Sequence, residues 1–287
     1  MEMRADGAPP EILYHYCDAN AFQGIVTSGQ LWLTNAAFTN DYTEHKLLIK
    51  GALKAIGESS REPRRSPGDG ASPQRLAEML RDANVPYIFS FSPKGDRLSQ
   101  WRAYSDDGMG FVIGFSSAGV GAACEEARAT FRRRSGMECS IALRKAKYGK
   151  RERREFLTWC LGIYGDDRAA GRTSSDREAA IGIWTEAAVH KNPGFREEAE
   201  WRVVWMPPIT GAGRFDSSSI RFRVAGSRIL SYYALPFRPD AIVKIRLGPG
   251  NCARERRRRA ALKMFLQASG YDVGRIRCSK ATYRPVR

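Results

Sequence analysis

The clearest local signals of the fold lie in "EILYHYCDANAFQGIVTSGQLWLTN", residues 11–35. Its pattern predicts a short strand over 12–16, a helix that ends at Gly29 and a second strand over 31–33. His15 lies inside the first strand, between two tyrosines. Because an imidazole buried in a strand is costly unless its nitrogens are satisfied, either the fold or a ligand must supply partners for His15.

Outward from this stretch, the chain alternates between helical and extended patterns. Helices are expected over 44–57, 74–83, 98–104, 176–190 and 253–268, and strands over 86–92, 110–115, 198–206 and 241–247. Strands and helices are interspersed without a regular βαβ cadence. This order predicts an α+β fold rather than a doubly wound sheet.

Two segments stand apart in composition. Residues 59–72, "SSREPRRSPGDGAS", are poor in apolar residues and rich in Ser, Pro, Gly and Arg, which predicts a mobile loop. Residues 120–155 are basic and weakly patterned, which predicts a basic insertion.

The formal net charge of +16 is concentrated in two places. Residues 128–155 hold 11 Lys/Arg against 3 Asp/Glu, and residues 254–287 hold 11 against 2. Two basic surfaces on a nearly neutral scaffold suit a polyanionic partner such as nucleic acid. Solvated charged faces of a soluble protein are the alternative, and it explains the runs equally well. The candidate nucleic-acid contacts are Arg132, Arg133, Arg134, Arg256, Arg257, Arg258 and Arg259.

Several classes of protein are disfavoured by the same composition. No apolar run reaches the roughly 18 residues that a membrane span needs, and the N-terminus lacks the pattern of a secretory signal, so a cytoplasmic protein without a membrane partner is expected. The six cysteines are scattered and form no CxxC pair, so we expect them reduced and mostly buried. The three histidines lie far apart, which makes a zinc site improbable, and no metal is assigned.

Five short stretches, in the same order, carry a resemblance to a known family. They are "LYHY" with "NDYTE", "FSFSPKGDRLSQWRAY" with "GFVIGF", "GFREEAEWRVV", "IRLGPG" and the terminal "CSKATYRP". Through them the chain resembles, along nearly its full length, the bacterial family called domain of unknown function 2971. The resemblance implies a single composite domain over 1–287, with a core over about 11–285, and it implies no activity.

A second resemblance suggests chemistry. ADP-ribosyltransferases use a first strand that bears His or Arg, a following helix, a second strand or turn that bears Ser or Tyr, and a late strand that opens on a catalytic Glu. This chain is similar in order, with His15, then Ser90 and Ser92 in "FSFS", then Glu198 and Glu200 in "EEAEWRVV". The resemblance implies a split sheet flanked by helices, and NAD as the substrate.

The carboxylate pair fits the chemistry of that reaction. Cleaving the bond between nicotinamide and ribose passes through an oxocarbenium-like transition state, which a carboxylate and hydrogen bonds to the adjacent 2-hydroxyl stabilise. Because side chains alternate along a strand, a strand over 198–206 would place Glu198 and Glu200 on one face, about 6 to 7 Å apart. We expect Glu200 to be the transition-state carboxylate and Glu198 its neighbour, with the reverse assignment open. The alternative is the exposed polar face of a half-buried strand.

The remaining cofactor residues follow from the same hypothesis. His15 would bind the ribose hydroxyls of NAD with one donor and one acceptor, and Tyr16 would stack on a base. In "LSQWRAY", Trp101 and Tyr104 lie at i and i+3 and would wall the nicotinamide pocket, while Arg102 would hold the pyrophosphate. The alternatives are a core histidine satisfied by backbone, a core aromatic pair and a surface arginine.

These residues lead to one hypothesis and two rivals. The hypothesis is an ADP-ribosyltransferase-like enzyme that modifies nucleic acid, or a protein, as toxins and phage-defence components of that class do. The first rival is a metal-dependent nuclease built from Asp41, Glu44, Asp96, Glu198 and Glu200, although Asp41 and Glu44 also fit a helix cap. The second rival is a noncatalytic nucleic-acid-binding or sensor module.

Overall fold

The computed structural model describes most of the chain. The described residues are 7–39, 44–59, 72–81, 86–136, 138–169, 175–208, 216–252, 255–271, 274 and 276–283. The expected loop over 59–72 falls almost wholly outside these ranges.

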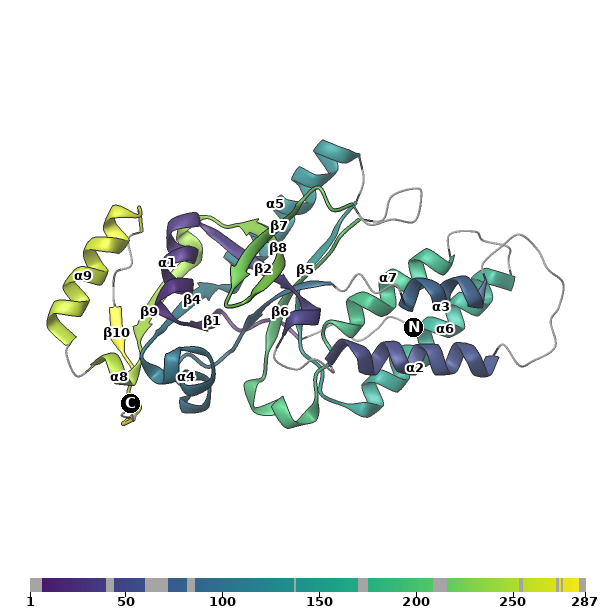
Figure 1. Ribbon diagram of the computed structural model, residues 1–287, viewed down its shortest axis with the longest axis horizontal. Helices are drawn as coiled ribbons and strands as arrows, with labels where there is room; N and C mark the ends of the chain where they lie inside the picture. Colours follow the sequence, from purple (N-terminus) through teal and green to yellow (C-terminus); the bar gives the residue numbers. More distant parts are fainter. Residues whose placement is uncertain are drawn as a thin grey trace.

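Helices and strands are interspersed along the described chain (Figure 1). The α-helices are α1 (Ala19–Ser28), α2 (Glu44–Ser59), α3 (Pro73–Arg81), α4 (Leu98–Tyr104), α5 (Ser117–Ser135), α6 (Lys150–Ala169), α7 (Ser175–Ala187), α8 (Pro249–Cys252) and α9 (Glu255–Ala268). The 3-10 helices are η1 (Ala36–Phe38), η2 (Asp106–Gly108), η3 (Pro193–Glu198) and η4 (Pro239–Ala241). The strands are β1 (Ile12–Cys17), β2 (Gln30–Asn35), β3 (Tyr87–Phe91), β4 (Phe111–Ser116), β5 (Ser140–Lys145), β6 (Trp201–Met206), β7 (Ile220–Ala225), β8 (Arg228–Pro236), β9 (Ile242–Leu247) and β10 (Ile276–Cys278).

The opening stretch folds as its local signals predict. The Asp18 side chain accepts a hydrogen bond from the Ala21 amide (2.7 Å) at the start of α1, and Gly29 ends the helix with a φ of 60°. That conformation is left-handed and costs glycine little. The helix buries Phe22, Ile25 and Val26, which share one face because they lie three and four residues apart.

The strands form two sheets. The four-stranded sheet has the order β1-β4-β9-β10, and the six-stranded sheet has the order β5-β6-β3-β2-β8-β7. The sheets meet where β1 passes β3, through one isolated antiparallel bridge between Tyr14 and Ser92. The two backbone hydrogen bonds of that bridge measure 2.8 and 2.7 Å. The α+β prediction is therefore confirmed. The fold has two separate sheets that this bridge connects.

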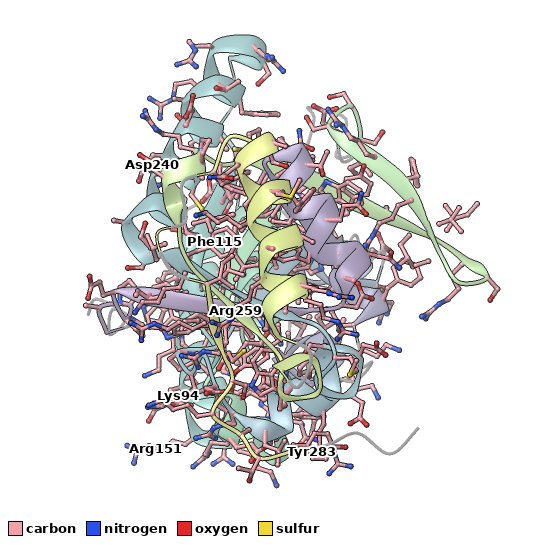
Figure 2. All side chains as sticks on the ribbon, turned by 90° about the vertical axis from the view of Figure 1, so that its left-hand side faces the viewer. Lys94, Phe115, Arg151, Asp240, Arg259 and Tyr283 are labelled. Atoms are coloured by element: carbon pink, nitrogen blue, oxygen red, sulfur yellow. The ribbon has the colours of Figure 1, made fainter. Side chains whose placement is uncertain are left out.

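The described residues form two large hydrophobic cores and two smaller clusters of buried apolar residues. The larger core lies between the sheets and helices α1 and α5, and includes Leu13, Phe115 and Val203. The second core lies among α2, α3, α6 and α7, around Leu48 and Trp184. These four helices form a lobe that extends to one side of the sheets, on the right in Figure 1. On the opposite side, α9 packs beside α1 (Figure 2), where the rings of Phe22 and Phe265 lie 6.2 Å apart.

Three sequence expectations need correction. Residues 120–155 are no weakly patterned insertion, because they form most of α5, all of β5 and the start of α6, and β5 is a strand of the six-stranded sheet. The late strand begins at Trp201 rather than at residue 198. The β7–β8 hairpin was not predicted at all, and it projects from the body of the molecule (Figure 2).

The five cysteines whose side chains the structure describes agree with the prediction. Cys17, Cys124, Cys139 and Cys160 are free and buried, and Cys278 is free and half-buried. Within the described part of the chain, no helix has the length and apolar content that crossing a membrane requires.

Candidate functional site

A cleft of about 780 Å³ opens over one face of the six-stranded sheet. Side chains alternate across a sheet, so β2 turns Leu31 and Leu33 into the core and presents Trp32 and Thr34 to the cleft. The floor continues on neighbouring strands with Ile88, Ser90, Arg202, Arg223 and Leu230. One wall comes from β1 and the first turns of α1. The cleft thus spans the sheet from β6 to β7.

His15 lies in this wall. Its Nδ1 is 2.9 Å from the backbone oxygen of Ser90, and its ring lies 4.2 Å from the ring of Phe89. Since a carbonyl oxygen can only accept, Nδ1 carries the proton and Nε2 is left as an acceptor. Burial lowers the pKa of His15 to about 4, with the Ser90 carbonyl and Asp18 acting in the opposite sense. The imidazole is therefore neutral at pH 7, satisfied on one side by backbone and lining the cleft.

Glu198 and Glu200 come from two different elements. Glu198 ends η3, Ala199 has a φ of 47°, and Glu200 directly precedes β6. A non-glycine residue in this left-handed region is uncommon. Here the left-handed conformation of Ala199 separates the 3-10 helix from the strand. The expected strand-face geometry of the pair is therefore wrong. The alternative of an exposed polar face is wrong as well, because the residues are only 8% and 4% exposed.

The two carboxylates nevertheless meet at one lysine. Lys191 Nζ lies 2.5 Å from Glu198 Oε2 and 2.7 Å from Glu200 Oε2. Arg202 donates from Nε and Nη2 to both oxygens of Glu200, at 2.8 and 2.9 Å. All four side chains are buried and line the cleft. Two anions and two cations balance, as buried charges require.

Glu200 is held more tightly than Glu198. Its backbone amide donates to the Tyr148 hydroxyl (2.9 Å), and its carbonyl accepts from Ala146 (2.8 Å). Desolvation would raise the pKa of Glu200, but Arg202 and Lys191 outweigh it and hold the pKa at about 2. Glu200 is thus a fixed anion whose two oxygens are both occupied by Arg202.

Glu198 has a different environment. The Tyr104 hydroxyl donates to its Oε1 at 2.8 Å, and the Ser92 hydroxyl approaches its backbone oxygen at 3.4 Å. Burial and the Glu198 carboxylate raise the pKa of Tyr104 well above its usual range, which keeps this hydroxyl protonated and donating. Of the two carboxylates, Glu198 is the one held by groups that a ligand hydroxyl could replace.

The structure brings most of the expected cofactor residues together and separates two. His15, Tyr16, Ser90, Ser92 and Tyr104 line the cleft. Ser90 does so with its backbone oxygen engaged by His15. The Tyr16 hydroxyl donates to the Lys94 carbonyl (2.6 Å) and accepts from the Arg97 amide (2.9 Å), so Tyr16 anchors the loop after β3.

Trp101 and Arg102 lie away from the cleft. Trp101 is fully buried, packs edge-on against Tyr16 at 5.0 Å, and donates from Nε1 to Asp96 (2.9 Å). Arg102 is exposed and lies near Asp107 (3.7 Å) and over the ring of Tyr283. The pocket-wall and pyrophosphate roles predicted for these two residues are therefore wrong, and the core and surface alternatives hold.

The basic segments also lie outside the cleft. Arg132, Arg133 and Arg134 end α5 and are exposed, and Arg132 pairs with Glu138 (2.5 Å). On α9, Arg257 is exposed while Arg258 and Arg259 are half-buried, and the side chain of Arg256 is outside the described residues. Helices α5 and α9 lie on separate parts of the molecule (Figure 1). Arg259 lies on the side of the molecule that faces the viewer in Figure 2.

The residues proposed for a metal-dependent nuclease do not assemble where they are described. Asp96 does not line the cleft; it accepts hydrogen bonds from Trp101, from Ser279 (2.5 Å) and from the Lys280 amide (2.9 Å). Asp41 and the side chain of Glu44 lie outside the described residues. Among the residues that the structure does describe, no three His, Cys, Asp or Glu side chains are grouped as metal ligands.

The sequence analysis did not predict the Lys and Arg side chains that line the cleft among the described residues: Lys191, Arg202 and Arg223. Arg202 carried a signal, because an arginine two residues after Glu200 on an otherwise apolar strand is expected to be buried and paired. Arg223 lies in a hairpin whose signal was an alternating pattern on either side of Gly226, which has a φ of 59°. Lys191 had no such signal.

The fold and cleft define an α+β protein with a charged cleft beside the junction of two sheets. The family model described as protein of unknown function, DUF2971, matches residues 100–203. This match supports the resemblance to that family predicted from the sequence, over residues 100–203. The matched region includes Tyr104, Lys191, Glu198, Glu200 and Arg202. No curated protein and no solved structure matches the chain.

Proposed function

We propose that the chain is an ADP-ribosyltransferase-like enzyme, which binds NAD in the cleft and transfers ADP-ribose to a macromolecular acceptor. One observation carries the proposal. His15, from the first strand, and Glu198, from the last third of the chain, line the same cleft although they are far apart in the sequence. A buried carboxylate can stabilise the positive charge that develops when an N-glycosidic bond is cleaved, and a neutral imidazole can bind a ribose hydroxyl.

His15 would position the nicotinamide ribose. Its Nδ1 proton is committed to the Ser90 carbonyl, which leaves Nε2 to accept a hydrogen bond from a ribose hydroxyl. The pKa of about 4 keeps that nitrogen unprotonated at neutral pH. His15 is in this proposal a binding residue that holds no proton for transfer.

The bond that breaks joins C1′ of the ribose to the ring nitrogen of nicotinamide. Its electron pair leaves with nicotinamide, which becomes neutral, and positive charge develops on C1′ and the ring oxygen. An oxygen or nitrogen of the acceptor then forms the new bond to C1′ and releases its proton to solvent. A carboxylate that holds the 2′-hydroxyl stabilises the developing charge.

Glu198 is the better candidate for that carboxylate. Its Oε1 accepts from the Tyr104 hydroxyl at 2.8 Å, an interaction that a ribose hydroxyl can share or replace. Glu200 has both oxygens committed to Arg202 and would serve as a fixed anion that positions Lys191 and, through it, Glu198. This reverses the order expected from the sequence.

Nucleic acid is the favoured acceptor, and a protein is the alternative. The exposed arginines at the end of α5 suit phosphates, but charge steers encounter without naming the target. Their position away from the cleft also suits a noncatalytic nucleic-acid-binding module, which is the second candidate function.

The test uses NAD labelled in its adenylate half, with single-stranded DNA, RNA or a protein fraction as acceptor. Released nicotinamide and label attached to the acceptor are measured. Glu198→Gln should lower the rate by about 10²- to 10³-fold, since several kcal/mol of transition-state stabilisation disappear. Glu197→Gln is the matched control, because Glu197 is the exposed neighbour of Glu198.

Two outcomes would overturn the proposal. One is no release of nicotinamide with any acceptor class. The other is an equal fall in rate in both variants, when unfolding curves show both to be folded. Binding of nucleic acid without any cleavage of NAD would support the noncatalytic module.

A further inference from the structure

The cleft has a second end, over β2 and β7, where two buried donors have no acceptor. Trp32 Nε1 and Arg223 Nε are both buried, and neither has a hydrogen-bond partner among the described residues. Both side chains line the cleft. Buried N–H groups are nearly always paired in native proteins, so a pair of unpaired ones in one place points to a ligand.

The fold holds Arg223 firmly in this position. Its guanidinium lies 5.7 Å from the centre of the Trp32 ring, and Nη2 donates to the Thr34 hydroxyl at 3.0 Å. The Trp32 ring lies in turn 4.7 Å from the ring of Tyr232. Contacts on two sides hold the guanidinium beside the Trp32 ring, and because Arg223 Nε and Trp32 Nε1 have no exposed surface, a ligand oxygen reaches them when these side chains shift toward the cleft.

Arg223 also lacks a neighbouring anion. No carboxylate of the described chain forms an ion pair with it, whereas Arg202 on the same floor has Glu200. Burial lowers the pKa of Arg223, with Tyr232 acting weakly in the opposite sense. A half-buried guanidinium with an unsatisfied donor is the arrangement that a bound anion would complete.

We propose that this end of the cleft is a phosphate subsite, in which Arg223 and Trp32 donate to the phosphate oxygens of a nucleotide. The guanidinium fork matches phosphate geometry, and Trp32 adds a second donor and an aromatic face. The inference rests on the proposed function and deepens it, because it assigns the ADP half of NAD to this end. Arg223 takes the pyrophosphate role that was predicted for Arg102.

The dimensions of the floor agree with this assignment. The strands run in the order β6-β3-β2-β8-β7 between Arg202 and Arg223. The Arg223 guanidinium, however, lies over β2, where it contacts Trp32 and Thr34. Two strand spacings of about 4.8 Å separate β2 from β6, so the phosphate subsite lies on the order of 10 Å from the carboxylates. This separation leaves room for a ribose between the carboxylates and the phosphates of a nucleotide.

The test is isothermal titration of the full chain with ADP-ribose, inorganic phosphate and adenosine. Arg223→Gln should weaken ADP-ribose binding by about 10- to 100-fold and leave adenosine binding unchanged. Arg221→Gln is the matched control, because Arg221 lies two residues away on the same strand, is exposed and does not line the cleft. Its ADP-ribose affinity should equal that of the unchanged chain.

Two further variants keep the test interpretable. Arg223→Lys retains the charge without the fork and should bind ADP-ribose with intermediate affinity. Trp32→Phe retains the ring without Nε1 and should weaken binding by less than Arg223→Gln does. Tighter binding of ADP-ribose than of inorganic phosphate is expected if the subsite serves a nucleotide.

Several results would overturn the subsite: no binding of ADP-ribose by the unchanged chain, unchanged affinity in Arg223→Gln, or equally weakened binding in Arg221→Gln and Arg223→Gln. The subsite and the proposed function fail separately. Arg223-dependent binding of ADP-ribose without release of nicotinamide would support the subsite and count against the transferase. Release of nicotinamide that is unchanged in Arg223→Gln would support the transferase and count against the subsite.

Discussion

The two ends of the cleft differ in how their charged side chains are paired. At the β6 end, Glu198, Glu200, Lys191 and Arg202 balance one another at distances of 2.5 to 2.9 Å. At the β7 end, Arg223 has a hydroxyl and an aromatic ring beside it, with no carboxylate of the described residues in an ion pair. The charges of the first end are balanced in the folded chain. In our proposal, the cation of the second end gains its counter-charge when an anion binds.

The largest effect expected from this difference is on stability. Arg202→Met leaves Glu200 buried with one cation instead of two, and should lower the free energy of unfolding by about 3 to 5 kcal/mol. Arg223→Met removes a cation that has no ion pair to break, and should change it by about 1 kcal/mol or less. Urea denaturation of both variants measures the contrast, and equal destabilisation would show that the two ends do not differ.

The second-largest effect is expected from acid, which should lower the contribution of the β6 end to the free energy of unfolding. The folded pKa of Glu200 is about 2, below its ordinary value of 4.5, so this group stabilises the fold above pH 4.5 and loses that contribution as the pH falls toward 2. The full contribution is on the order of 3 kcal/mol. Glu200→Gln should remove this share of the pH dependence. Denaturation midpoints at pH 5 and pH 3 report it, and an unchanged slope in Glu200→Gln would contradict the assignment.

His15 should add a smaller pH dependence in a higher window. Its folded pKa of about 4 lies below the ordinary 6.5, so between these values the unfolded chain binds more protons than the folded one. The free energy of unfolding should therefore fall by about 1 to 2 kcal/mol as the pH drops from 6.5 to 4, with allowance for solvent screening of this half-buried side chain. His15→Gln should flatten this window and leave the Glu200 window unchanged, whereas a slope that survives in His15→Gln would place its cause elsewhere.

The smallest effect on stability is expected outside the cleft. Replacing Arg132, Arg133 and Arg134 together by Gln should change the free energy of unfolding by about 0.5 kcal/mol or less, since these side chains are exposed. If nucleic acid binds there, the slope of log affinity against log salt should fall by up to about 0.9 for each phosphate that the variant no longer neutralises. Filter binding at several salt concentrations measures it, and an unchanged slope would move the acceptor surface away from α5.

The fold was more predictable from the sequence than the cleft. The opening strand, helix and strand were readable because capping by Asp18, the left-handed turn at Gly29 and the apolar spacing of α1 are all local signals. The start of β6 was not readable, because the alternation of "EAEWRVV" continues through Ala199 although its φ of 47° breaks the strand. The two glutamates do line one cleft, as the resemblance implied, but the local pattern gave them the wrong geometry.

The charged partners lay beyond local pattern altogether. Lys191 meets Glu198 and Glu200 because η3 turns the chain back toward β6. Arg223 meets Trp32 because its side chain reaches across β8, the strand between β7 and β2. Both contacts depend on tertiary topology. Trp101 shows the converse, since an aromatic residue at helical spacing with Tyr104 proved to be core.

We propose that one cleft binds the phosphates of NAD near Arg223 and cleaves the bond between nicotinamide and ribose near Glu198. The most direct test is the steady-state release of nicotinamide from NAD by the unchanged chain, Glu198→Gln and Arg223→Gln in the same assay. We predict a fall in kcat of about 10²- to 10³-fold for Glu198→Gln. For Arg223→Gln we predict a rise in KM of about 10- to 100-fold with a smaller change in kcat. Release that neither substitution alters, or no release by the unchanged chain with any acceptor, would contradict the account.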